Sequence, residues 1–224
     1  MLGHLIPRDQ RGLTLVELMV GLAVGLIVVL AASAVLIERL RDHRALLVEA
    51  RLMQDLRTSM DIVTRDLRRA GYWGSAAKSM QSASATNPYV AIAPSHATAN
   101  TVNFAFSRDA SENNVVDENE NFGFRLRKGV VEMLIGGGGW QALTDAGTMT
   151  VDAFAVTPNT QAVSLRDSCE KPCDPAATAC GPAQWVRGFT VSITARSAAD
   201  AKVVRSLRSD VRLRNDAVLG ACPT

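Results

Sequence analysis

Four cysteines are the residues whose chemistry is easiest to assign. All of them lie in the last quarter of the chain, at Cys169, Cys173, Cys180 and Cys222. An even number of cysteines outside the cytoplasm predicts two disulfide bonds, and three pairings are possible. The alternative is a structural zinc site. It is disfavoured because the C-x3-C-x6-C spacing matches no common zinc motif and no histidine lies nearby.

An acidic run offers a second kind of chemistry. Asp117, Asn119 and Asn121 alternate as oxygen donors, which is a pattern that can surround a calcium ion. The EF-hand pattern fails, however, because Phe122 stands where the turn glycine should be and Lys128 where the bidentate glutamate should be. We therefore expect a solvated acidic loop here, with no metal and no cofactor.

Catalytic groups are sparse. His4, His43 and His96 are the three histidines, and none has a clear partner for a catalytic triad. The glycine run Gly136–Gly139 is followed by neither a GK[ST] sequence nor a helix-opening fingerprint, so it does not predict a phosphate-binding loop. The sequence predicts that the protein is not an enzyme.

An apolar segment near the N-terminus predicts a membrane helix. Leu18 to Ile37 contains no charged residue, and Ser33 is its one conspicuously polar side chain. Twenty residues at about 1.5 Å each match a hydrocarbon core of about 30 Å. A cleaved secretory signal is the alternative. The length of the run, the lack of an A-x-A-like site after it and Glu17 at its leading edge argue against that alternative.

The residues in front of this segment form a motif, Arg11-Gly12-Leu13-Thr14-Leu15-Val16-Glu17. It resembles the processing site of type IV prepilins and of type II secretion pseudopilins. The resemblance implies that prepilin peptidase cuts after Gly12 and methylates the new amine of Leu13. Most members of these families have phenylalanine at the first mature position, so Leu13 is a mild departure.

Glu17 would be the fifth residue of the mature chain. A carboxylate within a bilayer is costly unless it finds a partner. By the resemblance, the new N-terminal amine of another subunit supplies that partner and fixes the register of assembly. A mere interfacial position for Glu17 is the alternative.

Helical periodicity continues past the apolar segment. Apolar residues recur at intervals of three and four, and no proline occurs between Pro7 and Pro88. We expect one helix from about Leu15 to about Arg69, ended by Gly71. The sequence DLRRAGYWG at this end, GGGGWQALTD from Gly136 and RLRN from Arg212 resemble the PilW family of minor pilins, and more loosely the minor pseudopilin J of type II secretion.

Beyond Gly74 the pattern changes to short alternating runs that predict β-strands. Lys128-Gly129 separates two of them and predicts a tight hairpin. The expected strands are Tyr89–Ala93, Thr101–Phe106, Phe122–Arg127, Val130–Ile135, Thr148–Val156, Trp185–Arg196 and Val203–Arg214. Together they predict a mainly antiparallel sheet that covers the apolar stripe of the helix.

The charge balance argues against a dedicated nucleic-acid binder. Lys and Arg number 24 against 22 for Asp and Glu, which gives a formal charge of +2. Arginines along the second half of the helix could contact DNA. They could equally pair with acids on the same or a neighbouring helix, and the balanced signs favour such pairing.

These observations predict an α+β, pilin-like chain. Residues 1–12 would be the leader, 13–37 the transmembrane half of the helix, 38–70 its amphipathic half and 71–224 a periplasmic β-rich head. The resemblance implies a minor pilin in the inner membrane that primes pilus assembly for twitching motility and adhesion. Its partners would be other minor pilins, the major pilin, prepilin peptidase, the inner-membrane assembly platform and a tip adhesin.

Two alternatives remain open. A minor pseudopilin of a type II secretion system would have the same architecture. A membrane-anchored periplasmic enzyme or binding protein would need the match at Gly12 to be accidental.

Overall fold

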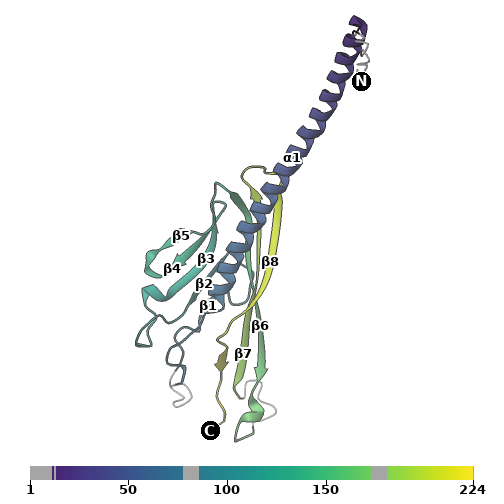
Figure 1. Ribbon diagram of the computed structural model, residues 1–224. Coiled ribbons are helices and arrows are strands. Elements are labelled where there is room, and N and C mark those ends of the chain that lie inside the picture. The colour runs from purple at the N-terminus through teal and green to yellow at the C-terminus, as the bar shows by residue number, and fades with distance from the viewer. Residues whose placement is uncertain (1–11, 13, 78–85, 173–180, 224) are drawn as a thin grey trace, which may run out of the picture. The chain divides into compact units, whose positions relative to one another are not determined.

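The computed structural model describes Gly12 and residues 14–77, 86–172 and 181–223. A single long helix, α1 (Leu15–Leu67), is followed by β-strands (Figure 1). The chain forms two compact units that meet at Leu47 and Val48, within this helix. We describe each unit by itself.

The first unit contains the apolar half of α1. Large apolar side chains from Leu15 to Leu47 are exposed, including Leu18 at 59% and Leu30 at 68%. Among the described residues, α1 is the one helix long and apolar enough to cross a membrane. An exposed apolar surface of this length is what a lipid environment requires and what water disfavours.

The second half of α1 buries one stripe of side chains. Leu52, Leu56, Met60, Val63 and Leu67 are spaced four, four, three and four residues apart, and each is at most 3% exposed. This spacing places them on one helical face, so they form the core side of an amphipathic helix.

The helix ends two residues before the predicted position. Turns follow Leu67, and Gly71 has a φ of 75°. That left-handed conformation favours glycine and turns the chain out of the helix. A Cβ on this residue would lie 2.8 Å from the Nη2 atom of Arg187, so a larger residue would displace that guanidinium.

Two antiparallel sheets replace the one that the sequence predicted. The first has the order β1-β2-β3-β4-β5, and the second has β6-β7-β8 with β9 paired to β7. The strands are β1 (Ile92–Ala93), β2 (Thr101–Ala105), β3 (Asn121–Arg127), β4 (Val130–Ile135), β5 (Trp140–Ala142), β6 (Met149–Ser164), β7 (Ala183–Ser197), β8 (Val204–Arg212) and β9 (Ala217–Leu219). Short 3-10 turns cover Glu118–Glu120, Gly136–Gly138 and Arg166–Ser168.

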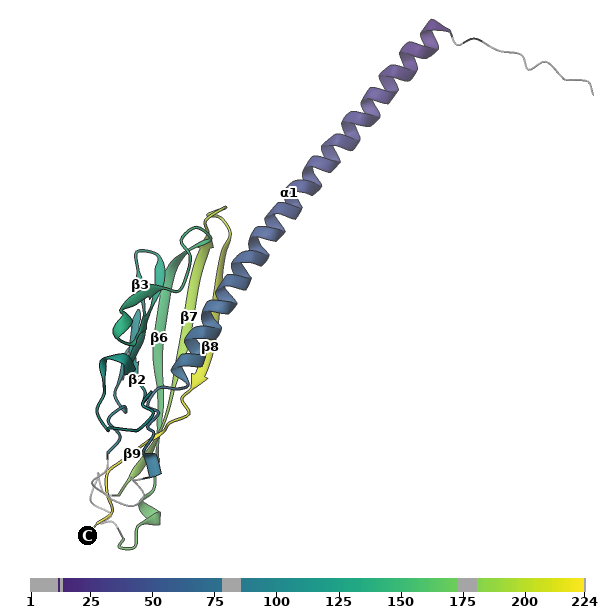
Figure 2. The same cartoon turned by 60° about the vertical axis from the view of Figure 1, so that its left-hand side comes forward.

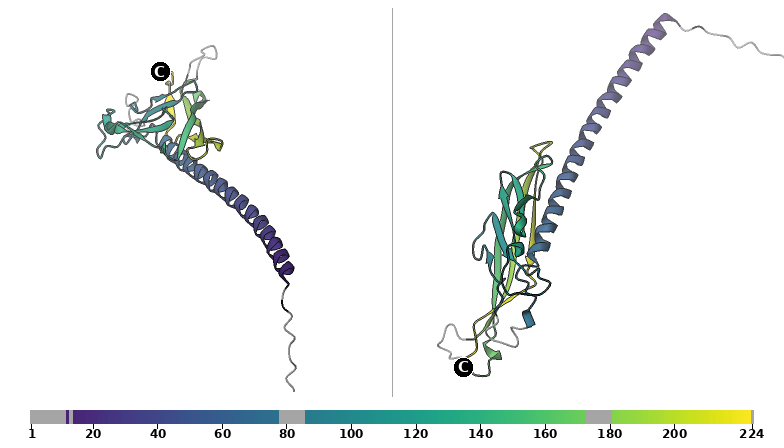
Figure 3. Two further views of the ribbon diagram at one scale, coloured as in Figure 1. Left: turned by 90° about the horizontal axis from the view of Figure 1, so that it is seen from above. Right: turned by 90° about the vertical axis from the view of Figure 1, so that its left-hand side faces the viewer.

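The core lies where both sheets meet the second half of α1. Figures 2 and 3 show this half of the helix beside β7 and β8, and buried side chains of the helix and of both sheets form one cluster. The first sheet contributes aromatic and aliphatic side chains, and the second contributes mainly aliphatic ones. Buried examples are Phe104, Phe122 and Phe124 from the first sheet, and Val156, Val191, Ile193 and Val211 from the second.

Aromatic stacking ties the end of the helix to the first sheet. The guanidinium carbon of Arg69 lies 4.1 Å from the ring centre of Phe106, and that ring stacks on Phe122 at 4.0 Å. The rings are nearly parallel, with 7° between their planes. Cation–π and aromatic contacts of this kind add to the apolar burial itself.

The hairpin between β3 and β4 has the predicted two-residue turn. Arg127 pairs with Val130, and both Lys128 and Gly129 have positive φ angles, of 51° and 78°. Positive φ at both central residues matches the right-handed twist of the flanking strands. The turn prediction is confirmed.

The glycine run forms a short, defined turn. Gly136–Gly138 forms a 3-10 turn that leads into β5, a strand the sequence did not predict. Gly136 has a φ of 52°, and a Cβ there would lie 2.6 Å from the backbone oxygen of Asn119. The glycine therefore permits close packing against the acidic loop.

Candidate functional site

The first candidate site is the start of α1, where Thr14 and Glu17 bind each other. The Thr14 backbone N–H and its hydroxyl each donate to Oε2 of Glu17 at 3.0 Å. The Glu17 backbone N–H donates to the Thr14 hydroxyl at 3.3 Å. This reciprocal pattern is a capping box, in which the side chains of the N-cap and N3 residues satisfy N–H groups that the helix leaves unpaired.

The capping box stabilises the Glu17 carboxylate at the start of an otherwise apolar helical segment. Its carboxylate lies in the first turn, where the helix dipole favours negative charge. In lipid the same hydrogen bonds reduce the number of unsatisfied polar groups, each of which is costly there. The site can therefore keep an anion at the leading edge of the membrane segment.

Gly12 lies two residues before this cap, and Leu13 lies outside the described residues. A Cβ built on Gly12 would have no atom within 4 Å in the described structure. Nothing in the described part of the fold therefore requires glycine at this position. A requirement for glycine there would have to come from another molecule, such as a processing enzyme.

The second candidate region is the end of α1, where distant segments meet. Arg187 on β7 donates to the carbonyl oxygen of Val90 at 2.5 Å and to that of Asn215 at 2.7 Å. The Asn215 side chain donates in turn to the Ala70 carbonyl at 3.1 Å. Burial lowers the pKa of Arg187, and the charge of Asp216 opposes that shift.

These contacts bring together two segments that lie far apart in the sequence. The backbone N–H of Arg214 donates to the carbonyl of Arg68 at 3.1 Å, so the RLRN segment caps the helix end that contains RRAGYWG. The arrangement fixes the head onto the helix. It supplies no reactive group, and its role is structural.

A buried tyrosine joins the acidic loop to the segment after α1. Tyr89 is fully buried, and its hydroxyl lies 2.9 Å from Oε2 of Glu120 and 3.1 Å from Oε1 of Glu112. Glu120 is also fully buried, and it accepts from the backbone N–H groups of Arg108 and Asp117 at 2.8 and 3.0 Å. The cluster anchors the loop through buried hydrogen bonds.

The same contacts shift two pKa values. Burial, followed by the hydrogen bonds to Glu120 and Glu112, raises the pKa of Tyr89 well above its usual range. Burial by itself raises the pKa of Glu112. Hydrogen bonds from Ser107 and from backbone N–H groups outweigh that effect, so the pKa of Glu112 lies below its ordinary value.

We expect Tyr89→Phe to lower the free energy of unfolding by about 1–3 kcal/mol near neutral pH, because Glu120 loses a buried donor. An unfolded tyrosine ionises near pH 10, whereas the raised pKa of Tyr89 keeps the folded phenol protonated. The contribution of Tyr89 to the free energy of unfolding should therefore be fully present below about pH 10. It should fall as the pH rises toward the pKa of the folded state. The difference between wild type and Tyr89→Phe should shrink over that range.

Urea titrations of the two proteins in detergent, at about pH 8 and about pH 11, would measure this difference. Tyr72→Phe is the matched control, because Tyr72 is 50% exposed and should change stability by less than about 0.5 kcal/mol. A constant difference between wild type and Tyr89→Phe at both pH values would contradict the role given to Tyr89.

The structure does not gather the proposed calcium ligands. Asp117 Oδ2 accepts from the Asn113 side chain at 3.0 Å, and the Asn121 side chain donates to the Asp117 carbonyl at 2.9 Å. Asn119 presents its carbonyl to Arg108 at 3.4 Å. In the described part of the chain, no three His, Cys, Asp or Glu side chains form a group that could hold a metal.

A disulfide joins Cys169 to Cys222, with 5.5 Å between their Cα atoms. It ties the segment after the third 3-10 turn to the C-terminal residues. Cys173 and Cys180 lie outside the described residues, so their pairing stays a prediction. Of the histidines, His43 is on α1 and His96 is in a loop, whereas His4 also lies outside the described residues.

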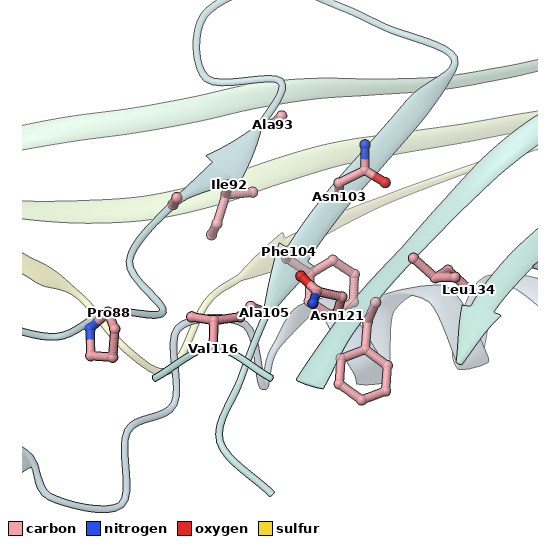
Figure 4. Close-up of a pocket in the computed structure, with 11 residues that line it drawn as sticks. Pro88, Ile92, Ala93, Asn103, Phe104, Ala105, Val116, Asn121 and Leu134 are labelled. Atoms are coloured by element: carbon pink, nitrogen blue, oxygen red, sulfur yellow. The ribbon is translucent and has the colours of Figure 1, made fainter. Parts of the chain in front are cut away.

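An open groove of about 530 Å³ lies on the first sheet, where residues of β1, β2, β3 and β4 line it (Figure 4). Its lining is apolar except for the carboxamides of Asn103 and Asn121. Other residues in the groove include Pro88, Ile92, Phe104, Val116 and Leu134. The lining contains no acid, base or nucleophile, so the groove offers no catalytic chemistry.

Two functional contacts were absent from the sequence predictions. Thr14 caps Glu17, and the T-x-x-E spacing of Thr14-Leu15-Val16-Glu17 is a known capping signal that could have revealed it. The Tyr89–Glu120 contact joins residues that are 31 positions apart, so no local sequence pattern predicts it.

Comparisons with known families agree with the geometry at the start of α1. Residues 7–33 match the prokaryotic N-terminal methylation motif. Residues 45–213, which are more than half of the chain, match the family of prepilin peptidase-dependent protein B. No curated protein and no solved structure matches the chain.

Proposed function

The chain belongs to the family of prepilin peptidase-dependent protein B, and from that premise we propose that it is a non-enzymatic minor pilin that helps to prime assembly of a type IV pilus. The observation that carries the proposal is at the start of α1. There the methylation motif ends in an apolar helix whose first turn holds Glu17 in a capping box.

We expect the subunit to pass through two stages, processing in the membrane and then assembly into the filament. The chain is first held in the inner membrane by α1, with its head in the periplasm, and prepilin peptidase removes residues 1–12. The subunit then joins other minor pilins and the major pilin on the assembly platform, and it reaches the extracellular filament near the tip. A tip adhesin would be a further partner.

A minor pseudopilin of type II secretion is the second candidate. The methylation motif and the long apolar helix support it equally, because both classes of filament use them. Detection of the subunit in filaments sheared from the cell surface would favour the pilus. Its absence there, with loss of protein secretion in a deletion strain, would favour the secretion system.

Mass spectrometry of the membrane-extracted protein tests the processing step. We expect the mature chain to begin with N-methylated Leu13. Gly12→Val should leave the precursor uncut, and because Gly12 has free space around its Cβ position, the fold itself should be unchanged. An intact Met1 terminus in cells with active prepilin peptidase would instead indicate a membrane anchor that is not a pilin.

A further inference from the structure

The second sheet continues past the core toward the C-terminus. Along β6 the core ends at Val156, and along β7 it begins at Phe189. The strand β8 pairs with β7 no further than Gly188. Beyond these points Asn159–Ser164 still pairs with Ala183–Gly188, and both strand ends extend past β8 in Figure 1.

The short strand β9 is the third strand of this extension. It pairs with Ala183–Trp185 of β7, on the edge that β6 does not occupy. Val218 is 61% exposed and Leu219 is 51% exposed, so β9 adds little apolar burial. We call the three paired segments the distal sheet, which consists of Asn159–Ser164, Ala183–Gly188 and Ala217–Leu219.

The distal sheet has almost no core of its own. The structure describes all of its residues, and Ala217 is the one buried residue among them. Every residue of its β6 segment is exposed. A small sheet generally needs a covered apolar face to be stable, and hydrogen bonds by themselves add little net stability in water. Some other interaction must therefore hold the distal sheet together.

The disulfide between Cys169 and Cys222 joins the two outer strands of the distal sheet. Cys169 directly follows the 3-10 turn Arg166–Ser168 at the end of β6, and Cys222 lies three residues after the end of β9. Since β7 pairs with both β6 and β9, the bond links the two strands that flank β7. It therefore keeps β9 next to β7, even though their other contacts are few.

This disulfide is open to a reductant from outside. Cys222 is exposed and Cys169 is partly exposed, and neither belongs to the core. A dithiol can attack one sulfur to form a mixed disulfide and then close on itself. In sum, the dithiol gives up two electrons and two protons, the bond between the two cysteines breaks to give two thiols, and the reductant becomes a disulfide.

We propose that the Cys169–Cys222 disulfide is a redox-sensitive clamp on the distal sheet. With the bond closed, β9 stays paired with β7. When a dithiol opens it, the distal sheet separates, whereas α1 and the core stay folded. The two cysteines are 53 positions apart, so reduction also lowers the stability of the whole head. The distal sheet opens first because it lacks a core, and this holds whether or not the proposed function is correct.

Hydrogen–deuterium exchange of the full-length protein in detergent, read by mass spectrometry, tests the clamp. Cys173→Ser with Cys180→Ser removes the other two cysteines, so the clamp is the one disulfide left. In this variant, dithiothreitol should speed exchange in peptides from the distal sheet at least tenfold. Peptides from Leu52–Leu67 and from Phe189–Ala195, which carry core residues, should stay protected while the distal sheet exchanges fully.

Cys169→Ser with Cys222→Ser is the matched variant, because it also replaces two cysteines by serine. Its distal sheet should exchange fast without any reductant. If this variant does not fold, reduction of Cys173→Ser with Cys180→Ser still gives the answer. Unchanged exchange of the distal sheet on reduction would overturn the proposal, since the strands would then need no clamp. Loss of protection in the core as fast as in the distal sheet would also overturn it, since the disulfide would then hold the whole head.

Discussion

Replacing Glu17 by alanine should remove this subunit from sheared filaments while leaving cleavage after Gly12 intact. In the proposed filament the carboxylate neutralises the N-terminal amine of a neighbour, and removing one member of a buried ion pair costs about 3–5 kcal/mol. A loss of that size corresponds to more than a hundredfold in an equilibrium constant, since about 1.4 kcal/mol gives tenfold. Immunoblots of sheared and cell-bound fractions would measure the effect.

Two further variants separate charge from capping. Glu17→Gln keeps a side chain that can complete the capping box but has no charge, whereas Thr14→Ala keeps the charge and removes the two hydrogen bonds of the Thr14 hydroxyl. We expect Glu17→Gln to be as defective as Glu17→Ala. Thr14→Ala should cost only about 0.5–2 kcal/mol of helix stability. Normal incorporation of Glu17→Gln would show that the proposed ion pair does not drive assembly.

Leu56→Ala should strongly destabilise the core between the helix and the sheets. Leu56 is completely buried in the stripe that α1 places against the sheets. Removing three carbons from such a site costs about 2–5 kcal/mol, through lost burial and the cavity that remains. Chemical denaturation of the detergent-solubilised protein, followed by tryptophan fluorescence, would give the free energy of unfolding.

Leu47→Ala is the control on the same helix. Leu47 is 70% exposed, so the same change in composition should alter the stability of the head by less than about 0.5 kcal/mol. Equal losses for the two variants would mean that the second half of α1 does not form the core as described.

Elements with strong periodicity were predictable from the sequence. The helix was expected from about Leu15 to about Arg69 and is observed from Leu15 to Leu67. The strand Val130–Ile135 has the bounds that were predicted, and its hairpin partner differs by one residue at its start. In these elements the apolar pattern and the turn residues Lys128 and Gly129 both indicate the hairpin that is observed.

Elements whose stability comes from pairing were not predictable. The second half of β6, from Thr157 to Ser164, is mostly exposed and contains Pro158, so it lacks an alternating pattern. It is a strand because it pairs with residues 183–190 of β7. The three-residue strands β5 and β9 were missed for the same reason, because they bury little and depend on a neighbouring strand.

The candidate site was partly predictable. Gly12, Leu13 and Glu17 were named from a contiguous motif, and their roles stay predictions. The exposure of the charged residues on the second half of α1 does not follow from the sequence. Charges alternate in sign along residues 49–68, and only burial and the Glu49–Arg205 contact show which of them face solvent. Exposure is a property of the packed chain, so the sequence pattern alone indicates a neutral helix.

The geometry of the capping box suggests how Glu17 could stay paired when a subunit leaves the membrane for the proposed filament. Both donors of Thr14 reach the same oxygen of Glu17, Oε2, and Oε1 accepts no hydrogen bond from the described residues. An arriving amine can therefore bind Oε1 before Thr14 releases Oε2. In the proposed assembly, transfer of the subunit from lipid into the filament would then pass through no unpaired carboxylate.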